Sequence, residues 1–322
     1  MQMENGTLKN CHALNWSHGS ARVLTIAAML ADCEFQVAGR GFSPFARAPW
    51  MDLGGTAGVT GHLAVLGGDF ACLPFGIGRD TQGAPPDWAA VLSGPTPGPI
   101  HGPAAEEAWT VLEVSDTAIR LGLDYPAASP VLRVERSIVG RPGVAALDCM
   151  LVIHARRRAA ISVGLHPVLR LPDVPGRLHL SARFDFGLTH PGYGATEFAD
   201  LAEVGLAHVP LSPRRDLNAQ LCGMRGPLRA VWLDEGMGVE LDWDRALLPS
   251  LQIWHTDRGI GGPPWHNTYR GIGVEPIASA FDLDTSVSCA PNPINARGVA
   301  TCITIDPAAP VTIRHAITAF AV

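Results

Sequence analysis

The chain of 322 residues is 47% hydrophobic and carries a formal net charge of −6, with only 24 Lys and Arg residues. These basic residues are spread thinly, so the sequence lacks the positive surface that binding to nucleic acid or to an anionic membrane needs, and neither partner is expected. No apolar run approaches the roughly 20 residues that cross a bilayer. Seven scattered cysteines without a C-x-x-C pair favour reduced thiols in a soluble, cytoplasmic protein.

The first apolar stretch covers residues 23–31. No basic cluster precedes it and no clean cleavage site follows it, so a buried strand is favoured over the core of a signal peptide. Residues 82–103 and 189–213 are rich in turn-forming residues and predict long loops, the second with a short helix around residues 198–204.

Apolar and polar residues alternate with a period of two along much of the chain, and helical periodicity is rare. The predicted strands are residues 109–114, 119–123, 132–138, 147–153, 161–165, 239–243, 251–254, 299–305 and 311–319. Gly, Pro, Asp and Asn separate them, which predicts an all-β fold: a large antiparallel β-sandwich. No charge run, low-complexity linker or repeat divides the chain, so one domain over residues 1–322 is expected.

The twelve histidines do not form a metal-binding pattern. Five of them have no partner at ligand spacing and are expected to be surface or satisfied strand histidines: His154, His179, His190, His208 and His315. His255 and His266 have no cysteine or carboxylate in register, so no metal site is predicted. The motifs G-x-G-x-x-G, the P-loop and G-x-S-x-G are also absent from the sequence, which removes the usual support for nucleotide binding and for α/β-hydrolase chemistry.

Two polar residues interrupt apolar strands. His166 in G-L-H-P-V-L-R-L-P precedes Pro167, whose ring favours an extended His166 at a strand end. Glu275 in G-I-G-V-E-P-I-A points to the opposite face from Val274, and a carboxylate there is costly to bury unless it is paired or used. Taken alone, the histidine could be bonded to the backbone and the glutamate could form an edge-strand salt bridge.

A series of motifs accompanies these two residues. In chain order they are G-G-D-F-A-C-L-P-F-G at residues 67–76, Arg79, the pair His101-Gly102, Trp109, His166, L-Q-I-W at residues 251–254 and V-E-P at residues 274–276. From about residue 35 to 320, this order resembles the galactose mutarotase-like superfamily, which includes aldose 1-epimerases and hexose-6-phosphate mutarotases. The resemblance implies a large antiparallel β-sandwich that acts on a sugar without a metal or cofactor.

The resemblance also implies roles for individual residues. Glu275 matches the general base, His166 the general acid, His101 a histidine that binds or polarises the sugar, and Arg79 a substrate-binding arginine. Aromatic side chains such as Trp254 and Trp265 can stack on the apolar face of a sugar ring. A tryptophan in a strand such as L-Q-I-W can equally be part of the hydrophobic core.

Two departures from the family pattern concern the substrate. The segment H-G-P-A-A places Ala105 where hexose-6-phosphate mutarotases have an arginine. The family's usual H-x-Y-F is replaced by H-P-V-L at residues 166–169. A neutral aldose is therefore expected, unless Arg79 or Arg270 binds a phosphate.

Interconversion of anomers needs one base for the C1 hydroxyl proton and one acid for the ring oxygen. A glutamate with a pKa near its ordinary value of about 4.3 would be ionised at neutral pH, and a supported histidine with a pKa near about 6.5 would hold a proton. We therefore expect an aldose 1-epimerase that acts on a monosaccharide. The alternatives are a non-catalytic carbohydrate-binding or regulatory module, a related sugar isomerase or lyase, and a hexose-6-phosphate mutarotase.

Overall fold

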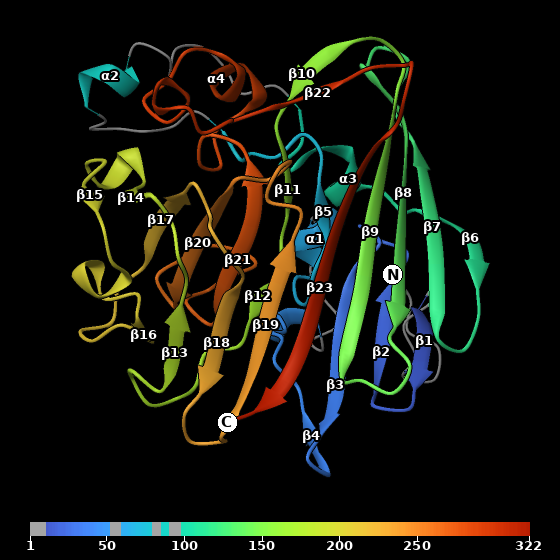
Figure 1. Ribbon diagram of the computed structural model, residues 1–322, viewed down its shortest axis with the longest axis vertical. Coiled ribbons are helices and arrows are strands. Elements are labelled where there is room, and N and C mark those ends of the chain that lie inside the picture. Colours follow the sequence, from blue (N-terminus) through green and yellow to red (C-terminus); the bar gives the residue numbers. More distant parts are fainter. Residues whose placement is uncertain (1–10, 52–58, 79–84, 90–97) are drawn as a thin grey trace.

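The computed structural model describes residues 11–51, 59–78, 85–89 and 98–322. Two large antiparallel sheets form the body of the molecule and pack face to face (Figure 1). This arrangement confirms the all-β sandwich that the alternating sequence pattern predicts. Among the described residues, no helix has the length and apolar character that crossing a bilayer requires.

One large sheet has nine strands. In spatial order they are β16 (His208–Val209), β13 (Leu178–Ser181), β18 (Leu228–Trp232), β19 (Met237–Trp243), β23 (Val311–Ala321), β9 (Ala146–Ala155), β8 (Val131–Gly140), β7 (Ala118–Asp124) and β6 (Thr110–Val114). Burial alternates residue by residue along most of β8, β9 and β23. One face of this sheet therefore meets the core and the other faces outward, as the period of two predicts.

The second large sheet carries the candidate site. Its strands are β15 (Glu197–Phe198), β14 (Phe186–Thr189), β17 (Leu217–Cys222), β20 (Ser250–Asp257), β21 (Arg270–Ala278), β11 (Val163–Leu165) and β5 (Ala71–Cys72), with β12 (Val168–Leu169) also paired to β21. Nearly every residue of β17, β20 and β21 is buried, because both faces of these central strands are covered.

The two sheets meet through apolar side chains. Val274 of β21 packs near Leu241 of β19 and Ile317 of β23 around a small void between the layers. Neighbouring residues of a strand point to opposite faces, so Glu275 is turned away from this core. The same apolar contacts that join the sheets therefore orient the carboxylate toward the other side of the eight-stranded sheet.

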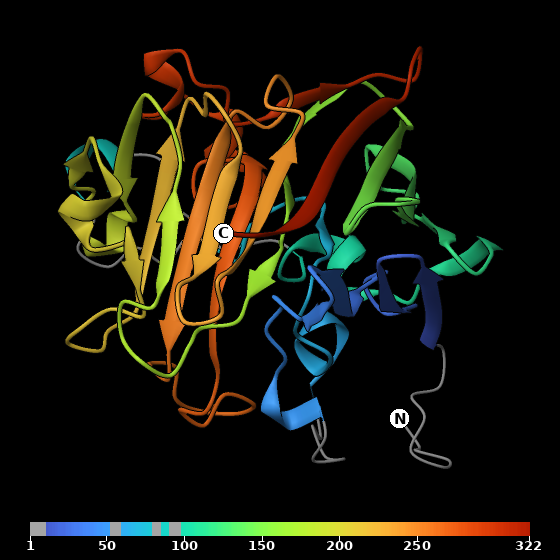
Figure 2. The same cartoon turned by 60° about the horizontal axis from the view of Figure 1, so that its bottom comes forward.

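A smaller sheet is built from β1 (Cys11–Trp16), β2 (Gly19–Leu24), β3 (Leu30–Val37) and β4 (Arg40–Phe42). It contacts β8 and β23 at the edge of the sandwich (Figure 1 and Figure 2). The single strand predicted over residues 23–31 is wrong, because the chain turns between β2 and β3, with Ala27 at φ 56° and Ala28 at φ 43°. Both alanines are fully buried, so the stretch is apolar as part of a covered hairpin.

A two-stranded ribbon joins β10 (Ala159–Ile161) to β22 (Ile303–Ile305). The predicted strand over residues 161–165 is thus divided between two sheets.

The helices are short: α1 (Gly61–Ala64), α2 (Pro86–Ala89), α3 (Gly102–Glu106), α4 (Thr285–Cys289), and the 3-10 turns η1 (Pro49–Met51), η2 (Pro191–Tyr193), η3 (Leu201–Val204) and η4 (Asn295–Arg297). The helix predicted over residues 198–204 is reduced to η3, which a capping box at Asp200 begins.

Candidate active site

Glu275 lies in the middle of β21, opposite Gln252 of β20. Its side chain is 1% exposed and lies across Gly273, two residues earlier on the same face. A Cβ on Gly273 would lie 2.1 Å from Oε1 of Glu275, so a residue without a side chain is needed at that point. The strand therefore provides both the position of the carboxylate and the space that it occupies.

His166 lies between β11 and β12, at the strand end that the following proline predicts. Its backbone N–H donates to the carbonyl of Phe70 at 2.8 Å, and its ring stacks on the Phe70 ring with centroids 4.5 Å apart. The Nε2 atom lies 3.4 Å from Oε1 of Glu275. The structure thus brings together two residues that are far apart in the sequence.

His101 is held by an unusual backbone turn immediately before α3. It has φ 56° and Gly102 has φ 72°, and a Cβ on Gly102 would lie 2.1 Å from the carbonyl oxygen of Leu73. Glycine is the residue that tolerates both conditions, which gives the His-Gly pair a physical reason. The Gly76 N–H donates to Nδ1 of His101 at 3.4 Å, so the ring proton is on Nε2.

His62 of α1 is a third histidine at the site, and sequence reasoning missed it. Its ring lies edge-on to His101 with centroids 5.5 Å apart. It also stacks on the Phe70 ring, with centroids 5.1 Å apart. Gln252 was also missed, although a polar residue inside L-Q-I-W is the kind of signal that identified Glu275.

These side chains line one cavity of about 210 Å³, which we call the inner chamber. Its polar lining is His62, His101, His166, Gln252, Glu275 and Asp282. Trp254 and Trp265 form an aromatic corner beside them, with ring planes at 80° to one another. Trp254 also lies edge-on to His166, with centroids 6.0 Å apart.

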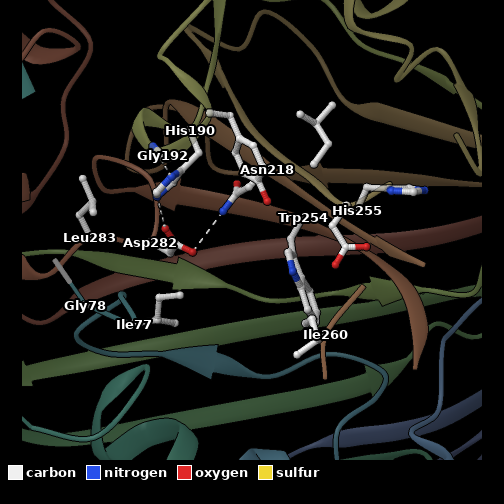
Figure 3. A pocket seen from close by; sticks show the side chains of 13 residues that line it. Ile77, Gly78, His190, Gly192, Asn218, Trp254, His255, Ile260, Asp282 and Leu283 are labelled. Atoms are coloured by element: carbon white, nitrogen blue, oxygen red, sulfur yellow. Dashed lines mark hydrogen bonds and ion pairs between the residues drawn. The ribbon is translucent and has the colours of Figure 1, made fainter. Parts of the chain in front are cut away.

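A larger cavity of about 540 Å³, the outer chamber, adjoins the inner one (Figure 3). Ile77, Trp254, Ile260 and Asp282 line both cavities, so the two lie side by side. The polar wall of the outer chamber is formed by His190, Tyr193, Asp216, Asn218, His255 and Asp282.

Burial sets the protonation of the inner chamber. It raises the pKa of Glu275 well above its ordinary value, and the Asp282 carboxylate adds to this rise. Burial, helped by His62, lowers the pKa of His166 to about 3, and it lowers the pKa of His62 to about 4. The expected near-ordinary pKa values are therefore wrong, because burial favours the uncharged form of both Glu275 and His166.

Many buried polar atoms of the two chambers have no hydrogen-bond partner among the described residues. They are Nδ1 of His62, Nδ1 of His166, Oδ1 of Asn218, Oε1 of Gln252, Nδ1 of His255, both carboxyl oxygens of Glu275 and Oδ1 of Asp282. Leaving such groups unpaired costs about 1–3 kcal/mol each, so this concentration indicates a binding site for a polar ligand.

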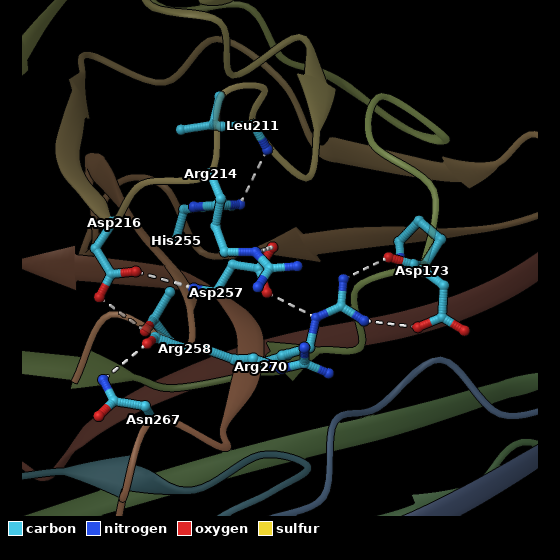
Figure 4. A network of polar contacts seen from close by, with 11 residues as sticks. Asp173, Leu211, Arg214, Asp216, His255, Asp257, Arg258, Asn267 and Arg270 are labelled. Atoms are coloured by element: carbon cyan, nitrogen blue, oxygen red, sulfur yellow. Dashed lines mark hydrogen bonds and ion pairs between the residues drawn. The ribbon is translucent and has the colours of Figure 1, made fainter. Parts of the chain in front are cut away.

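Of the two arginines predicted as substrate or phosphate ligands, only Arg270 lies within the described residues, and it lines neither chamber. Arg79 lies outside the described residues. Arg270 is occupied elsewhere, since its guanidinium donates to Asp257 at 2.7 Å, to Asp173 at 2.7 Å and to the carbonyl of Pro172 at 2.8 Å (Figure 4). Ala105 is fully buried in α3. Within the described residues, no lysine or arginine lines the two chambers.

One buried group has the composition of a metal site: Asp69, Cys149 and His315. Its carboxylate is already matched by cations, because Oδ2 of Asp69 accepts a hydrogen bond from Arg136 and lies 2.9 Å from Nε2 of His315. Burial alone would lower the pKa of His315, but Cys149 and Asp69 raise this pKa to about 9. This arrangement fits an internal ion network that anchors the segment before β5 to the nine-stranded sheet.

The fold is that of known galactose mutarotase-like proteins. A GalM/aldose epimerase homologue from C. elegans aligns with a TM-score of 0.64 at 11% identity, covering 97% of this chain and 99% of its own. A galactose mutarotase-like protein from Clostridium acetobutylicum gives 0.65 at 12%, covering 97% and 95%, and one from Lactobacillus casei gives 0.59 at 14%, covering 96% and 99%. No protein-family model and no curated protein sequence matches the chain. The likeness confirms the fold that the sequence motifs imply.

Proposed function

We propose that the chain is an aldose 1-epimerase that interconverts the anomers of a free aldose in the inner chamber. The observation that carries this proposal is the 3.4 Å contact between His166 and Glu275. In a cyclic aldose, the hydroxyl oxygen and the ring oxygen are both bonded to C1. A base for one and an acid for the other must therefore lie close together, as these two groups do.

In the proposed reaction, Glu275 accepts the proton of the C1 hydroxyl while His166 donates a proton to the ring oxygen. The C1–ring oxygen bond breaks and C1 becomes an aldehyde carbon. After rotation about the C1–C2 bond, the same transfers run in reverse and close the other anomer. The two groups share one proton throughout. The forms that burial favours, a protonated Glu275 and a neutral His166, are those that the pair has at the open aldehyde.

The remaining inner-chamber residues suit a sugar. His101 presents the N–H of its Nε2, which can donate to a sugar oxygen, because Nδ1 accepts from Gly76. Gln252 has an unpaired carbonyl oxygen among the described residues, which can accept from a hydroxyl. Trp254 and Trp265 offer apolar ring faces to the C–H groups of a pyranose. Arg79 remains a predicted substrate ligand.

A neutral aldose is favoured over a hexose 6-phosphate. The unpaired atoms of the chambers are acceptors or neutral imidazole nitrogens, and hydroxyl groups are the donors that match them. A phosphate dianion beside Asp282 and Glu275 would instead need a guanidinium clamp, and Ala105 replaces the arginine that the related family uses.

The experiment that tests this function measures anomer exchange by NMR on a panel of free and phosphorylated aldoses. We expect accelerated exchange of at least one free aldose with no new product. A new ketose or dehydrated product would support the related isomerase or lyase instead. Saturable sugar binding without faster exchange would support a carbohydrate-binding module.

A further inference from the structure

Two of the cysteines lie together outside the chambers. Cys289 is the last residue of α4, and Cys302 comes directly before β22. The S–H of Cys289 donates a hydrogen bond to Sγ of Cys302, so the two side chains are in contact although residues 290–301 separate them in the chain. Both thiols are free in this structure. α4 contacts β10, which pairs with β22 in the ribbon at the top of the molecule (Figure 1).

Hydrogen bonds of the neighbouring residues hold the two cysteines in place. Oγ1 of Thr301, the residue before Cys302, donates to the carbonyl of Ser288, the residue before Cys289, at 2.5 Å. Nδ2 of Asn295 donates to the same hydroxyl oxygen at 3.1 Å. The chain on both sides is therefore fixed independently of the sulfur atoms. Two side chains that already touch on a fixed backbone can be joined with little movement, which is the condition for a disulfide.

Solvent reaches this pair. Cys289 and Cys302 are half-buried, as is Cys11. The other four cysteines are buried: Cys33, Cys72, Cys149 and Cys222. Cys11 has the charged groups of Arg22 and Asp32 as its neighbours rather than a second thiol. A small reagent can thus reach three sulfur atoms of the folded chain, and two of these are in contact.

The two thiols differ in protonation. Burial raises the pKa of Cys289, and the neighbouring Cys302 raises it further, to about 12. Cys289 therefore keeps its proton at neutral pH, and its S–H can stabilise negative charge on the sulfur of Cys302. Because the thiolate is the nucleophile in disulfide exchange, Cys302 is the residue that reacts first and Cys289 the one that reacts second.

We infer that Cys289 and Cys302 form a redox modification site, at which a small disulfide such as oxidised glutathione converts the two thiols into a protein disulfide. The Cys302 thiolate attacks one sulfur of the reagent, whose S–S bond breaks, and one glutathione leaves as a thiolate. Sγ of Cys289 then attacks Sγ of Cys302. Its proton leaves with the second glutathione. The protein loses two hydrogen atoms, and one oxidised glutathione becomes two reduced molecules.

The disulfide would close residues 289–302 into a loop and fasten α4 to the start of β22. α4 in turn holds the segment that carries Asp282, because the Ala280 N–H donates to Oγ of Ser288 at 3.1 Å. Closing such a loop restricts the unfolded chain, so we expect oxidation to raise Tm by roughly 5 °C. This inference does not depend on the proposed function, since it concerns thiols that line neither chamber.

The test treats the folded, full-length chain with oxidised glutathione, denatures it in the presence of an alkylating agent and maps the peptides by mass spectrometry. We expect a peptide pair joined through Cys289 and Cys302, which dithiothreitol separates again. Any reaction at Cys11 should stop at a glutathione adduct, because this thiol has no partner to complete the exchange. The mapping of the wild-type chain needs no variant.

Serine variants test the order of the two steps. Cys289→Ser should accumulate a glutathione adduct on Cys302, because the second thiol is missing. Cys302→Ser should form an adduct at Cys289 at least tenfold more slowly, since Cys289 keeps its proton. Cys11→Ser is the matched control and should leave the link between Cys289 and Cys302 unchanged. Tm of each reduced variant shows that it is folded.

Three results would overturn the inference. Separate glutathione adducts on Cys289 and Cys302 of the wild-type chain would show that the sulfur atoms cannot join. Absence of reaction at both, under conditions in which the denatured chain reacts, would show that they are inaccessible. A Tm that stays the same or falls on oxidation would show that the link distorts the segment rather than fitting it.

Discussion

Nε2 of His166 lies 3.4 Å from Oε1 of Glu275, and both side chains are almost completely shielded from solvent. Burial acts on the two groups in opposite directions, raising the pKa of the acid and lowering that of the imidazole. The pair therefore keeps a single proton over a wide pH range, which is the number that a reversible acid–base exchange requires.

This shared proton predicts an unusual pH profile. His166 takes up a second proton only near its lowered pKa of about 3, and Glu275 loses the first only above its raised pKa. We expect kcat/KM for anomer exchange to show no inflection near the ordinary histidine pKa of about 6.5. A clear inflection with a pKa near 6.5 would show that His166 titrates as an exposed histidine does.

Folding must be followed in the same experiment, because the buried histidines affect stability. The folded-state pKa values of His62 and His166 are about 4 and about 3, below the ordinary value of 6.5, so the unfolded chain binds more protons at acid pH. Stability is therefore lost as pH falls below about 6.5. Circular dichroism at each pH distinguishes unfolding from a change in rate.

Gly273→Ala tests whether the strand positions the Glu275 carboxylate. The new Cβ would lie 2.1 Å from Oε1, so the carboxylate must move away while the backbone keeps its conformation. Because displacements of about 1 Å can cost 10²-fold in rate, we expect kcat/KM to fall at least tenfold with little change in Tm. Gly261→Ala is the control, since its Cβ meets only Oδ1 of Asn267 at 3.7 Å. Equal activity of the two variants would contradict the proposed placement.

Asp69→Asn tests the buried ion network. Burial alone would raise the pKa of Asp69, but Arg136 and His315 lower it overall, so its contribution to stability is present above about pH 4 and is lost as pH falls further. The variant leaves Arg136 buried without its counter-charge, which costs about 3–5 kcal/mol. We expect Tm to fall by roughly 6–15 °C at neutral pH.

Asp148→Asn is the matched control for this change. Asp148 pairs with Arg141 at the surface, where its side chain is 48% exposed, and such pairs contribute about 0–1 kcal/mol. A similar Tm for Asp69→Asn and Asp148→Asn would show that the internal network does not stabilise the fold.

Substrate charge gives a fourth prediction. We expect kcat/KM for a free aldose to exceed that for its 6-phosphate, because no described chamber residue is a lysine or arginine. Arg270→Ala should lower stability without changing this preference, since Arg270 binds Asp257 and Asp173. A tenfold preference for the phosphate that Arg79→Ala abolishes would contradict the neutral-substrate proposal.

The fold was predictable where one face of a strand meets solvent. Alternation along β9 and β23 reveals their strands, whereas β17 and β21 are buried on both faces and lack that signal. The hairpin at Ala27 and Ala28 was missed because buried turns lack the usual polar turn residues. The extent of the domain stays a prediction.

The candidate site was predictable only in part. His166 and Glu275 interrupt apolar strands, and the motif resemblance pairs them. His62, His190 and Asp282 have no such local signal, because their relevance comes from tertiary contacts: His62 and His166 both stack on the Phe70 ring, and the Asp282 carboxylate lines both chambers. The roles of Glu275, His166, His101 and Trp254 remain predictions.

The most direct test of the central claim is anomer exchange by Glu275→Gln, measured by NMR with sugar binding and Tm followed in parallel. The amide keeps the shape but cannot accept the proton of the C1 hydroxyl, so we expect exchange to fall about 10²–10⁴-fold while the sugar still binds. Since the folded state raises the pKa of Glu275, its ionisation costs stability as pH rises above about 4.5, and the variant should be at least as stable as wild type at pH 7. Unchanged exchange, or unfolding of Glu275→Gln, would contradict the account and leave Glu275 a structural carboxylate.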